Sequence, residues 1–298
     1  MQKKILITGS NGLLGQKLIL ALKNQHEVLA TSISDCVISD TNGFVYQSLD
    51  ITDRISVIKT FENFKPDVVI NTAAMTDVDG CEEKKGLCDK VNVTAVGYLI
   101  DECEKYKAHL IHISTDFIFD GEDGPYSETD EANPLSYYGL SKLKSEQLLY
   151  DSTINWTILR TIILYGTAEN LQRNNIVLSC RKALKEGKPL NIIDDQFRSP
   201  TLAEDLANAC VLTIEKQATG IFNASGKDFM SIFEMIERMA DFYNCDKSNI
   251  NRISSETLNQ KAKRPPKTGF ILTKSYEELG YEPHSFEEGL KLLEQQLN

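Results

Sequence analysis

Three glycines spaced three residues apart near the N-terminus place the strongest constraint on the fold. The apolar run Lys4–Thr8 precedes Gly9, and an amphipathic pattern over Leu14–Asn24 follows the turn. In such a strand-turn-helix unit, Gly9 permits a tight turn, Gly12 lets backbone N–H groups approach a pyrophosphate, and Gly15 lets the helix pack closely on the strand. A glycine-rich turn without a ligand would show the same spacing. The position of the motif favours a dinucleotide site.

Short apolar runs alternate with helical patterns through the first half of the chain. Strands are predicted at Lys4–Thr8, Glu27–Thr31, Phe44–Gln47, Val68–Asn71, Leu110–Ser114 and Thr157–Arg160. Helices are predicted at Leu14–Asn24, Ile55–Phe64, Lys84–Lys105 and Tyr137–Tyr150. This alternation predicts an α/β fold with a Rossmann-type, doubly wound parallel sheet. Ligands of such sheets lie beyond the carboxyl ends of the strands, so we expect Gly9, Asn71 and Ser114 to meet at one crevice.

The alternation of predicted strands and helices becomes less regular after about residue 165. No low-complexity linker marks a domain boundary there. Helices are predicted at Ile176–Glu186, Ala203–Glu215, Phe229–Tyr243 and Glu287–Gln296, and short strands at Leu190–Ile193 and Gly220–Asn223. We therefore expect residues 1–165 to form the dinucleotide-binding domain and residues 166–298 to form mainly a second lobe. A stretch of about residues 203–223 is expected to pack back on the first domain.

Composition narrows the class of protein. The chain has 298 residues, of which 41% are hydrophobic, and this is enough for one large domain and a small lobe. Its net charge of −11 argues against nucleic acid as a partner. Its seven scattered cysteines form no C-x-x-C pair and predict reduced thiols in a cytoplasmic protein. No apolar run is long enough to span a membrane, and the glycine turn interrupts any signal-peptide core.

A tyrosine and a lysine four residues apart, Tyr138 and Lys142, suggest acid-base chemistry. On one helix face this spacing places a phenol beside an ammonium, and the positive charge would favour the phenolate. We therefore expect the pKa of Tyr138 to be lowered, so that its phenol exchanges protons near neutral pH. The pair by itself would also suit a solvated helix surface, because both residues and this spacing are common.

The glycine turn together with Tyr138 and Lys142 resembles the extended short-chain dehydrogenase/reductase superfamily. Further segments resemble the signatures of the dTDP-4-dehydrorhamnose reductase family. These segments are Asn71–Asp79, Val91–Asn92, Ser114–Gly121, Glu128–Asp130, Pro134–Leu135, Arg160–Thr161, Asp195–Gln196, Pro200–Thr201 and Arg264–Pro265. They follow the family's order from end to end, so the resemblance covers the whole chain.

The resemblance implies a smaller C-terminal substrate-binding lobe and the reduction of a ketone. The expected substrate is a nucleotide-linked 4-keto-6-deoxysugar, first of all dTDP-4-dehydro-L-rhamnose, which would become dTDP-L-rhamnose. Hydride transfer creates an alkoxide that an acid must protonate, and Tyr138 is the candidate acid. Lys142 would bond the nicotinamide ribose, and the Thr115 hydroxyl would hold the substrate oxygen. An isolated threonine at a strand end would more simply satisfy its own backbone.

The resemblance also implies the residues that line each half of the site. The cofactor, NADPH or NADH, is expected at Gly9, Asn11, Gly12, Leu13, Leu14, Gly15, Ser32, Asp50, Ile51, Ala73, Ala74, Thr76, Asn92, Tyr138 and Lys142. The substrate is expected at Thr76, Val78, Ser114, Thr115, Asp116, Ile163, Arg198 and Arg264. A homodimer is left open.

The end of the second predicted strand does not decide between NADPH and NADH. An acidic residue there would bind the ribose hydroxyls of NAD, and an arginine would bind the extra phosphate of NADP. Asp35 lies too late for the first role, and Ser32 can hydrogen-bond either group. Asp50-Ile51 resembles the family's adenine contact. Asp50 could also cap the helix expected from about Thr52, and both roles could hold.

Three departures from the family pattern bear on the substrate and on a metal. Ile163 stands where the family often has a tryptophan, so a wall remains without an aromatic stacking face. Arg198 stands where the family often has glycine, and it could bind a phosphate or pair with Asp194 or Asp195 on the surface. Some members bind magnesium through acidic residues at a dimer contact, but Lys17 occupies that neighbourhood, so we predict no metal.

Two other reactions and one non-enzymatic role share this fold. The dehydratases of nucleotide sugars need a carboxylate after the aspartate that follows the catalytic threonine, and Phe117 cannot serve. A 4-epimerase would use the same threonine, tyrosine and lysine, although its usual motifs differ from those found here. A regulatory subunit of the same family would typically have lost part of the set Thr115, Tyr138 and Lys142.

Overall fold

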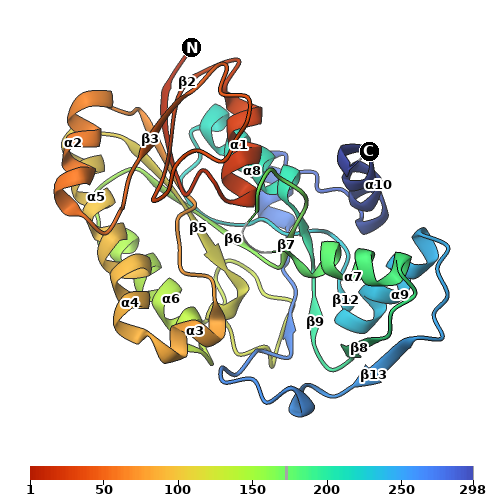
Figure 1. Cartoon of the computed structure of the whole chain (residues 1–298). Coiled ribbons are helices and arrows are strands. Elements are labelled where there is room, and N and C mark those ends of the chain that lie inside the picture. Colours follow the sequence, from red (N-terminus) through yellow and green to blue (C-terminus); the bar gives the residue numbers. More distant parts are fainter. Residues whose placement is uncertain (172–173, 298) are drawn as a thin grey trace.

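The computed structural model describes residues 1–171 and 174–297 and has an open α/β sheet at its centre (Figure 1). Seven parallel strands form this sheet in the order β11–β6–β5–β4–β1–β2–β3. Their bounds are β1 Lys4–Thr8, β2 Glu27–Ser32, β3 Val45–Ser48, β4 Val68–Asn71, β5 His109–Thr115, β6 Trp156–Thr161 and β11 Gly220–Asn223. The order runs outward from β1 in both directions, which confirms the doubly wound sheet. The strands predicted in the first half are confirmed to within one residue at each end.

Helices cover both faces of the sheet (Figure 1). One face carries α1 and α8, which pack against each other, and the other carries α2, α5 and α6. The bounds are α1 Leu13–Leu22, α2 Arg54–Phe64, α3 Val78–Glu83, α4 Lys85–Asp89, α5 Ala95–Tyr106, α6 Tyr137–Tyr150 and α8 Ala203–Lys216.

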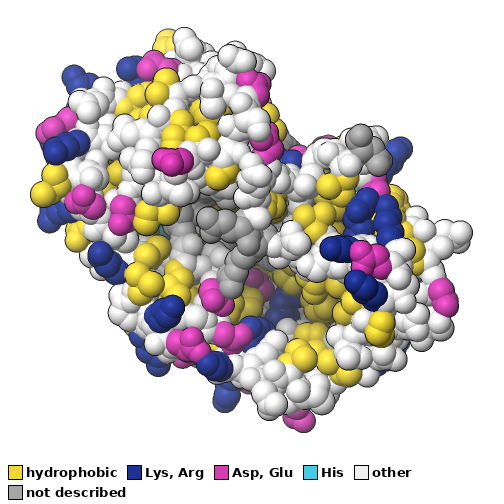
Figure 2. All heavy atoms as spheres, in the orientation of Figure 1, with side chains coloured by type: hydrophobic (Ala, Val, Ile, Leu, Met, Phe, Trp, Pro, Cys, Tyr) yellow, Lys and Arg dark blue, Asp and Glu magenta, His cyan; other side chains and the backbone are white. Residues whose placement is uncertain are grey.

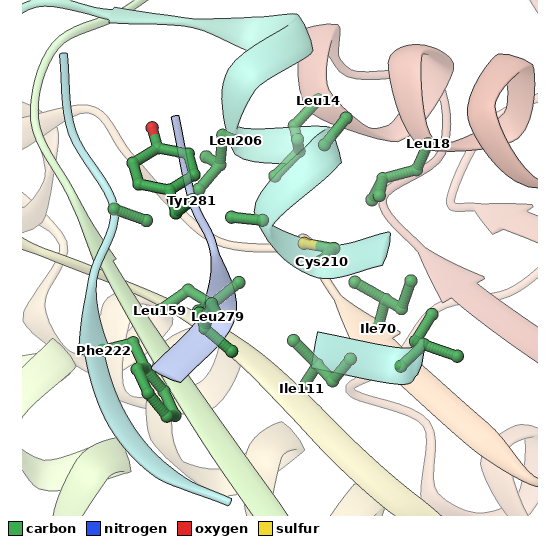
Figure 3. Close-up of a cluster of buried hydrophobic side chains, with 14 of the residues drawn as sticks. Leu14, Leu18, Ile70, Ile111, Leu159, Leu206, Cys210, Phe222, Leu279 and Tyr281 are labelled. Carbon is green, nitrogen blue, oxygen red and sulfur yellow. The ribbon is translucent and has the colours of Figure 1, made fainter. Parts of the chain in front are cut away.

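Alternation along the strands builds these two faces. In β1, Ile5 and Ile7 point into the cluster beneath α1 and α8, whereas Leu6 points into the cluster beneath α2 and α5. Figure 3 shows the first cluster, whose labelled members come from α1, β4, β5, β6, α8 and β11, together with Leu279 and Tyr281 from the segment before α10. Each fully buried aliphatic side chain contributes about 1.5–3 kcal/mol. The hydrophobic effect therefore fixes which face of each strand meets which helices.

The helix predicted over Lys84–Lys105 is wrong in its continuity. The structure has α4, then a π-helical turn at Lys90–Thr94, then α5, and it adds the short α3 before them. Asn92, within the π-helical turn, uses its side chain to bond the backbone of Met75. Such turns often occur at functional sites, and periodicity alone cannot reveal them because the extra residue changes the phase by only part of a turn.

The second half of the chain builds a lobe from short, paired strands. Strand β9 lies between β12 and β14, β13 pairs with β8, and β10 pairs with β7. The bounds are β7 Leu164–Tyr165, α7 Ile176–Lys185, β8 Leu190–Ile193, β9 Phe197–Arg198, β10 Thr201–Leu202, β12 Met230–Ser231, α9 Ile232–Phe242, β13 Ile250–Ile253, β14 Lys267–Thr268 and α10 Phe286–Leu297. The helix predicted from Phe229 begins three residues later in the structure, because β12 occupies the residues directly before it. A separate cluster that includes Val177, Ile236 and Leu290 forms the core of this lobe.

Parts of the second half belong to the sheet. Strand β11 pairs with β6, and Leu206 and Phe222 lie in the first cluster (Figure 3). Leu279 and Tyr281 lie there too, although they are far along the chain. The division at residue 165, with about residues 203–223 packing back on the first domain, remains a prediction, and Leu279 and Tyr281 lie outside that stretch. Figure 2 shows a hollow between the two halves, with hydrophobic side chains along part of its wall.

Candidate active site

The glycine turn after β1 leaves the N-terminus of α1 open. Gly9 has φ +70°, which a β-carbon would strain, and a β-carbon on Gly15 would lie 2.5 Å from Ser10 Cα. Gly12 is the N-cap of α1, no side chain caps the helix, and its first turn has no acidic residue. The first N–H groups of this helix are therefore available to an anion, as a pyrophosphate requires. The residues present fit a dinucleotide.

Helix α6 brings Tyr138 to the end of β5. The Ser136 hydroxyl caps the helix by accepting a hydrogen bond from the Gly139 N–H at 3.2 Å. A β-carbon on Gly139 would collide with the carbonyl oxygen of Phe117, so glycine permits the close approach of α6 to the turn after β5. The Phe117 and Tyr138 rings meet edge to face with centroids 5.7 Å apart. The local sequence thus places the phenol over the carboxyl end of the sheet.

The hydroxyl of Thr115, the last residue of β5, lies near the Tyr138 phenol and lowers the pKa of that phenol. The Thr115 hydroxyl also donates to Asp116 Oδ1 at 3.1 Å and accepts from the Phe117 N–H. Burial raises the pKa of Tyr138, and the Thr115 hydroxyl opposes that rise only in part. The predicted lowering of this pKa is therefore wrong: desolvation outweighs any effect of a nearby cation. At neutral pH the phenol stays protonated and can donate.

Lys142 lies one turn after Tyr138 but its ammonium is directed elsewhere. Its side chain is 2% exposed, and its Nζ lies 2.9 Å from His112 Nε2. Burial lowers the pKa of Lys142 to about 8. His112 also contacts Asn71 and Ser145. Sequence analysis missed His112, and the available signal was a histidine inside an otherwise apolar buried strand.

Asp116 belongs to a buried polar cluster that joins β5 to the lobe. Its carboxylate accepts hydrogen bonds from Thr115 and from the Thr268 hydroxyl on β14, and Arg198 Nε on β9 lies 3.6 Å from Oδ2. Burial raises the pKa of Asp116 and lowers that of Arg198, so desolvation exceeds the attraction within the pair. The cluster holds the residue next to Thr115 in place.

Arg198 does not pair with a surface aspartate, so that alternative is wrong. Its guanidinium is buried and donates to the carbonyl oxygens of Phe197, Pro265 and Pro266 and to Gln196 Oε1. The surface carboxylates have other partners: Asp194 lies 3.9 Å from Arg252, and Asp195 bonds the Ser254–Ser255 turn. A phosphate could reach Arg198 only if some of these carbonyl groups gave way.

The predicted adenine side of the cofactor site holds several local contacts. Asn11 donates to Ser34 Oγ, to the Asp35 carbonyl and to Tyr46, and thereby tethers the segment that follows Ser32 at the end of β2. The two N-terminal leucines of α1 differ in exposure, since Leu14 is buried and Leu13 is only partly so.

Asp50 does not cap α2. Its carboxylate accepts from the N–H and hydroxyl of Thr52 and so forms a turn, whereas Asp53 caps the helix, which begins at Arg54. Ile51 beside it is buried. The alternative that Asp50 caps this helix is therefore wrong, because the capping residue lies three positions later. The two bonds from Thr52 use only one carboxylate oxygen of Asp50, which leaves the other for a further role.

The segment after β4 is held by Asn92. Its amide spans the backbone of Met75 and donates to Ser141 Oγ on α6 at 2.9 Å. Ala73 and Ala74 are partly buried beside the glycine turn, where Ala73 N would lie 2.7 Å from a β-carbon on Gly9. Thr76 is exposed. These contacts place the segment between the turn after β1 and α6.

The predicted substrate residues lie in three different settings. Arg264 binds the carboxylate of Asp79, one residue after the partly buried Val78, at 2.8 Å. Ile163 has φ +29°, a strained value for a β-branched residue, and it packs against both hydrophobic clusters. Ser114 is buried, and its hydroxyl has no hydrogen-bond partner in the described part of the chain. An unpaired buried hydroxyl beside Thr115 is a group that a ligand could satisfy.

Lys17 lies in a polar cluster away from the catalytic residues. Its ammonium lies 2.8 Å from Glu204 Oε1 and donates to Gln296 Oε1 at the same distance. This cluster borders a cavity of about 770 Å³ lined by residues of α1 and α8. Within residues 1–171 and 174–297, no group of three or more histidine, cysteine or acidic side chains could hold a metal ion.

Comparison with known proteins identifies the family. The model of the RmlD substrate binding domain matches residues 3–298. The chain belongs to this family. It is 32% identical over 302 residues to dTDP-4-dehydrorhamnose reductase of Aggregatibacter actinomycetemcomitans, with 97% of each chain covered. It is also 32% identical over 262 residues to methionine adenosyltransferase 2 subunit beta of Xenopus tropicalis, covering 86% of this chain and 77% of the relative.

Solved structures agree with this assignment. A dTDP-4-dehydrorhamnose reductase from Clostridium acetobutylicum is 33% identical, with a TM-score of 0.87 and 99% of each chain covered. The reductase of the same name from Bacillus anthracis, solved in complex with NADP, is 26% identical with a TM-score of 0.87 and covers 99% of this chain and 100% of its own. Across the described residues of the present chain, no helix has the length and apolar character needed to cross a membrane.

Proposed function

We propose that this RmlD-family chain reduces the C4 ketone of a nucleotide-linked 4-keto-6-deoxysugar with NADPH or NADH. The first substrate to test is dTDP-4-dehydro-L-rhamnose, whose product would be dTDP-L-rhamnose. The observation that carries the proposal is that Thr115 and Tyr138 lie together at the carboxyl end of β5, with Lys142 one turn after Tyr138 on α6 and an uncapped helix N-terminus after β1. The names of the relatives at 32% and 33% identity support the same reaction.

Each member of the catalytic set has a distinct task in this proposal. A bound nicotinamide supplies the hydride. The Tyr138 phenol donates a proton to the developing alkoxide, and its raised pKa keeps it protonated until then. The Thr115 hydroxyl holds the substrate oxygen near the phenol. Lys142, one turn later on α6 and with a pKa of about 8, would bind the nicotinamide ribose.

The cofactor would lie across the ends of β1, β4 and β5. The open N–H groups of α1 would bind the pyrophosphate, Asp50 and Ile51 would flank the adenine, and Asn92 would support the nicotinamide side. Ser32 leaves both NADPH and NADH open, while the relative from Bacillus anthracis was solved with NADP. The remaining cofactor residues of the proposal are Gly9, Asn11, Gly12, Leu13, Leu14, Gly15, Ala73, Ala74, Thr76 and Lys142.

The sugar nucleotide would bind between the sheet and the lobe. Ser114 offers an unpaired hydroxyl, and Ile163 offers an aliphatic wall. Thr76, Val78, Asp116, Arg198 and Arg264 complete the proposed set. Phe117 removes the carboxylate that a dehydratase would need, and its ring packs on Tyr138 instead.

A stoichiometric assay tests the reaction. The purified chain should consume one reduced nicotinamide per sugar converted, measured by nicotinamide absorbance together with product analysis. Product formed without cofactor loss would instead indicate a 4-epimerase. Binding of cofactor and sugar without turnover, across several 4-keto-6-deoxysugars, would favour a binding subunit, a role that the likeness to methionine adenosyltransferase 2 subunit beta keeps as the second candidate.

We further propose that the protein works in the cytoplasm, and a homodimer is its proposed assembly. The seven cysteines are all free, and five of them are buried, as suits a reducing compartment. Light scattering of the purified chain would measure the assembly.

A further inference from the structure

A row of hydrogen bonds crosses three strands and ends at Lys142. Thr8, Asn71 and His112 are register partners on β1, β4 and β5. The Thr8 hydroxyl lies 2.6 Å from Asn71 Oδ1, and Asn71 Nδ2 lies 3.1 Å from His112 Nδ1. The next contact, 2.9 Å long, joins His112 Nε2 to Lys142 Nζ. All four side chains are buried, so no solvent replaces these bonds.

The hydrogen-bond donors and acceptors in this row restrict the tautomer of His112. An ammonium has only donors, so a charged Lys142 requires His112 Nε2 to accept. A neutral imidazole then carries its proton on Nδ1, and the Asn71 atom that faces it must be the amide oxygen. A neutral Lys142 can accept as well as donate, and the Ser145 hydroxyl can accept too, so the opposite arrangement is then permitted, with the imidazole proton on Nε2 and the Asn71 amide nitrogen facing Nδ1. The oxygen and nitrogen of an amide are interchangeable in shape, so both arrangements fit.

The surroundings keep His112 itself neutral. Burial, with the Lys142 ammonium next to it, lowers the pKa of His112 well below its ordinary value. The other titratable groups that affect Lys142 are Glu146, one turn later on α6, and Cys88 on α4. Glu146 is already held by Arg160 of β6 through both carboxylate oxygens. Lys142 therefore has a neutral hydrogen-bond acceptor rather than a counter-ion as its direct partner.

We propose that His112 is a positioning residue for Lys142: its neutral imidazole accepts one hydrogen bond from the ammonium and leaves the other N–H groups for the cofactor. The Ser145 hydroxyl lies 3.1 Å from His112 Nε2 and donates its proton to the Lys142 carbonyl, so it can accept from the imidazole only in the Nε2–H form. Removing the acceptor would leave a desolvated ammonium without a partner, so Lys142 would lose its proton at lower pH. The cofactor part of this inference rests on the proposed role of Lys142.

The tautomer of His112 is the first test, and it needs neither cofactor nor substrate. The chain has four histidines, so ¹⁵N-histidine labelling gives four ring systems, and the signal lost in His112→Gln assigns the one of interest. At about pH 6.5, where Lys142 is charged, we expect the Nδ1–H tautomer. It should convert to Nε2–H as the pH passes about 8, and the conversion should disappear in Lys142→Met. An Nε2–H tautomer throughout would overturn the proposal.

Cofactor affinity is the second test. Calorimetry at about pH 7 should show NADPH binding weakened about tenfold in His112→Leu, with the alkaline loss of affinity beginning at lower pH than in the wild type. His112→Gln, whose amide oxygen can accept, should restore part of both effects. The control His109→Leu removes another β5 histidine, which contacts Thr157 and not Lys142, and should change neither. Unchanged binding in His112→Leu, or equal loss in His109→Leu, would contradict the proposal.

These two tests separate this inference from the proposed function. A chain that shows the expected tautomer change but no turnover keeps the His112–Lys142 contact and loses the reductase assignment. A chain that turns over with His112 in the Nε2–H form at all pH values keeps the reaction and loses the positioning role. If His112→Leu fails to fold, the spectrum of the wild-type protein still decides.

Discussion

Two buried cations come from the two halves of the molecule, Lys142 on α6 and Arg198 on β9, and their partners differ. Each of them is 2% exposed. The Lys142 ammonium contacts a neutral imidazole, whereas the Arg198 guanidinium lies near a carboxylate, that of Asp116, and donates to backbone carbonyl groups. Burial lowers both pKa values, but only that of Lys142 comes near the physiological range, at about 8.

Because of this difference, the region around Lys142 can change its charge, whereas the cation of the region around Arg198 has only a structural role. Lys142 can lose a proton and leave a neutral pair with His112, so its charge can respond to the reaction. Arg198 stays charged, and its several acceptors join β9 to the segment before β14 and, through Asp116, to the end of β5. Replacing either cation by methionine, which has a similar length and no charge, tests the comparison directly.

The largest expected effect is on stability, from Arg198→Met. The variant leaves the buried Asp116 carboxylate without its cation, and we expect the free energy of unfolding to fall by ~3–5 kcal/mol. Urea denaturation at neutral pH would measure it. The control Arg252→Met removes an exposed arginine 3.9 Å from Asp194 and should cost less than ~1 kcal/mol. Equal losses in the two variants would mean that Arg198 is not a structural cation.

Tyr138→Phe should affect turnover and leave stability nearly unchanged. The phenol is the proposed acid on the Lys142 side, so its loss should lower kcat by ~10²-fold or more while NADPH affinity stays close to that of the wild type. The matched control is Tyr137→Phe. The Tyr137 hydroxyl is next to that of Tyr138 in the sequence, but it donates to Asp89 at 2.5 Å. Wild-type kcat in Tyr138→Phe, with hydride transfer still limiting, would remove the acid assignment.

The pH dependence of stability should distinguish Lys142 from Arg198. The folded state lowers the pKa of Lys142 from 10.5 to about 8, so between these values the unfolded chain binds more protons. The contribution of Lys142 to the free energy of unfolding must therefore rise with pH across this window. Unfolding at several pH values should show wild type gaining on Lys142→Met from about pH 8 to pH 10.5. Parallel curves would mean that Lys142 titrates as an ordinary lysine.

The smallest expected effect comes from Ser114, the residue before Thr115 at the end of β5. Its buried hydroxyl has no described partner, so Ser114→Ala should change the free energy of unfolding by less than ~1 kcal/mol, or raise it slightly. Ser141→Ala, which loses bonds to Asn92 and to the Tyr138 carbonyl, should cost about 1 kcal/mol. A KM for the sugar raised several-fold in Ser114→Ala alone would support substrate contact. An unchanged KM would exclude it.

Regular patterns explain how much of the fold could be predicted. Each strand of the first half alternates or runs apolar over four to seven residues, and a period of two is set by the backbone itself. The helix expected over Lys84–Lys105 is interrupted by a π-helical turn, and Asn92 in that turn bonds Met75, which lies outside the helix and beyond any local pattern. The short strands β9, β10, β12 and β14 have two residues each, too few for any period to show.

The candidate site could be predicted only in part from the sequence, for the same reason. The Tyr138–Lys142 spacing is local and could be read directly. The direction of a pKa depends on how much water each group loses, so burial reversed the expectation for Tyr138. The partners of Arg198 come from Pro265 and Pro266, nearly seventy residues away, and no local rule could have excluded a surface aspartate.

The sequence by itself determined the parallel sheet, the glycine turn and the residue types of the candidate catalytic set, because these follow from backbone periodicity and from chemistry that few side chains possess. Only the tertiary structure decided which polar groups became partners. It set Thr8, Asn71 and His112 side by side on adjacent strands and directed Lys142 to the end of that row. Burial then set the proton affinities, because the cost of desolvating a charge depends on everything that surrounds it.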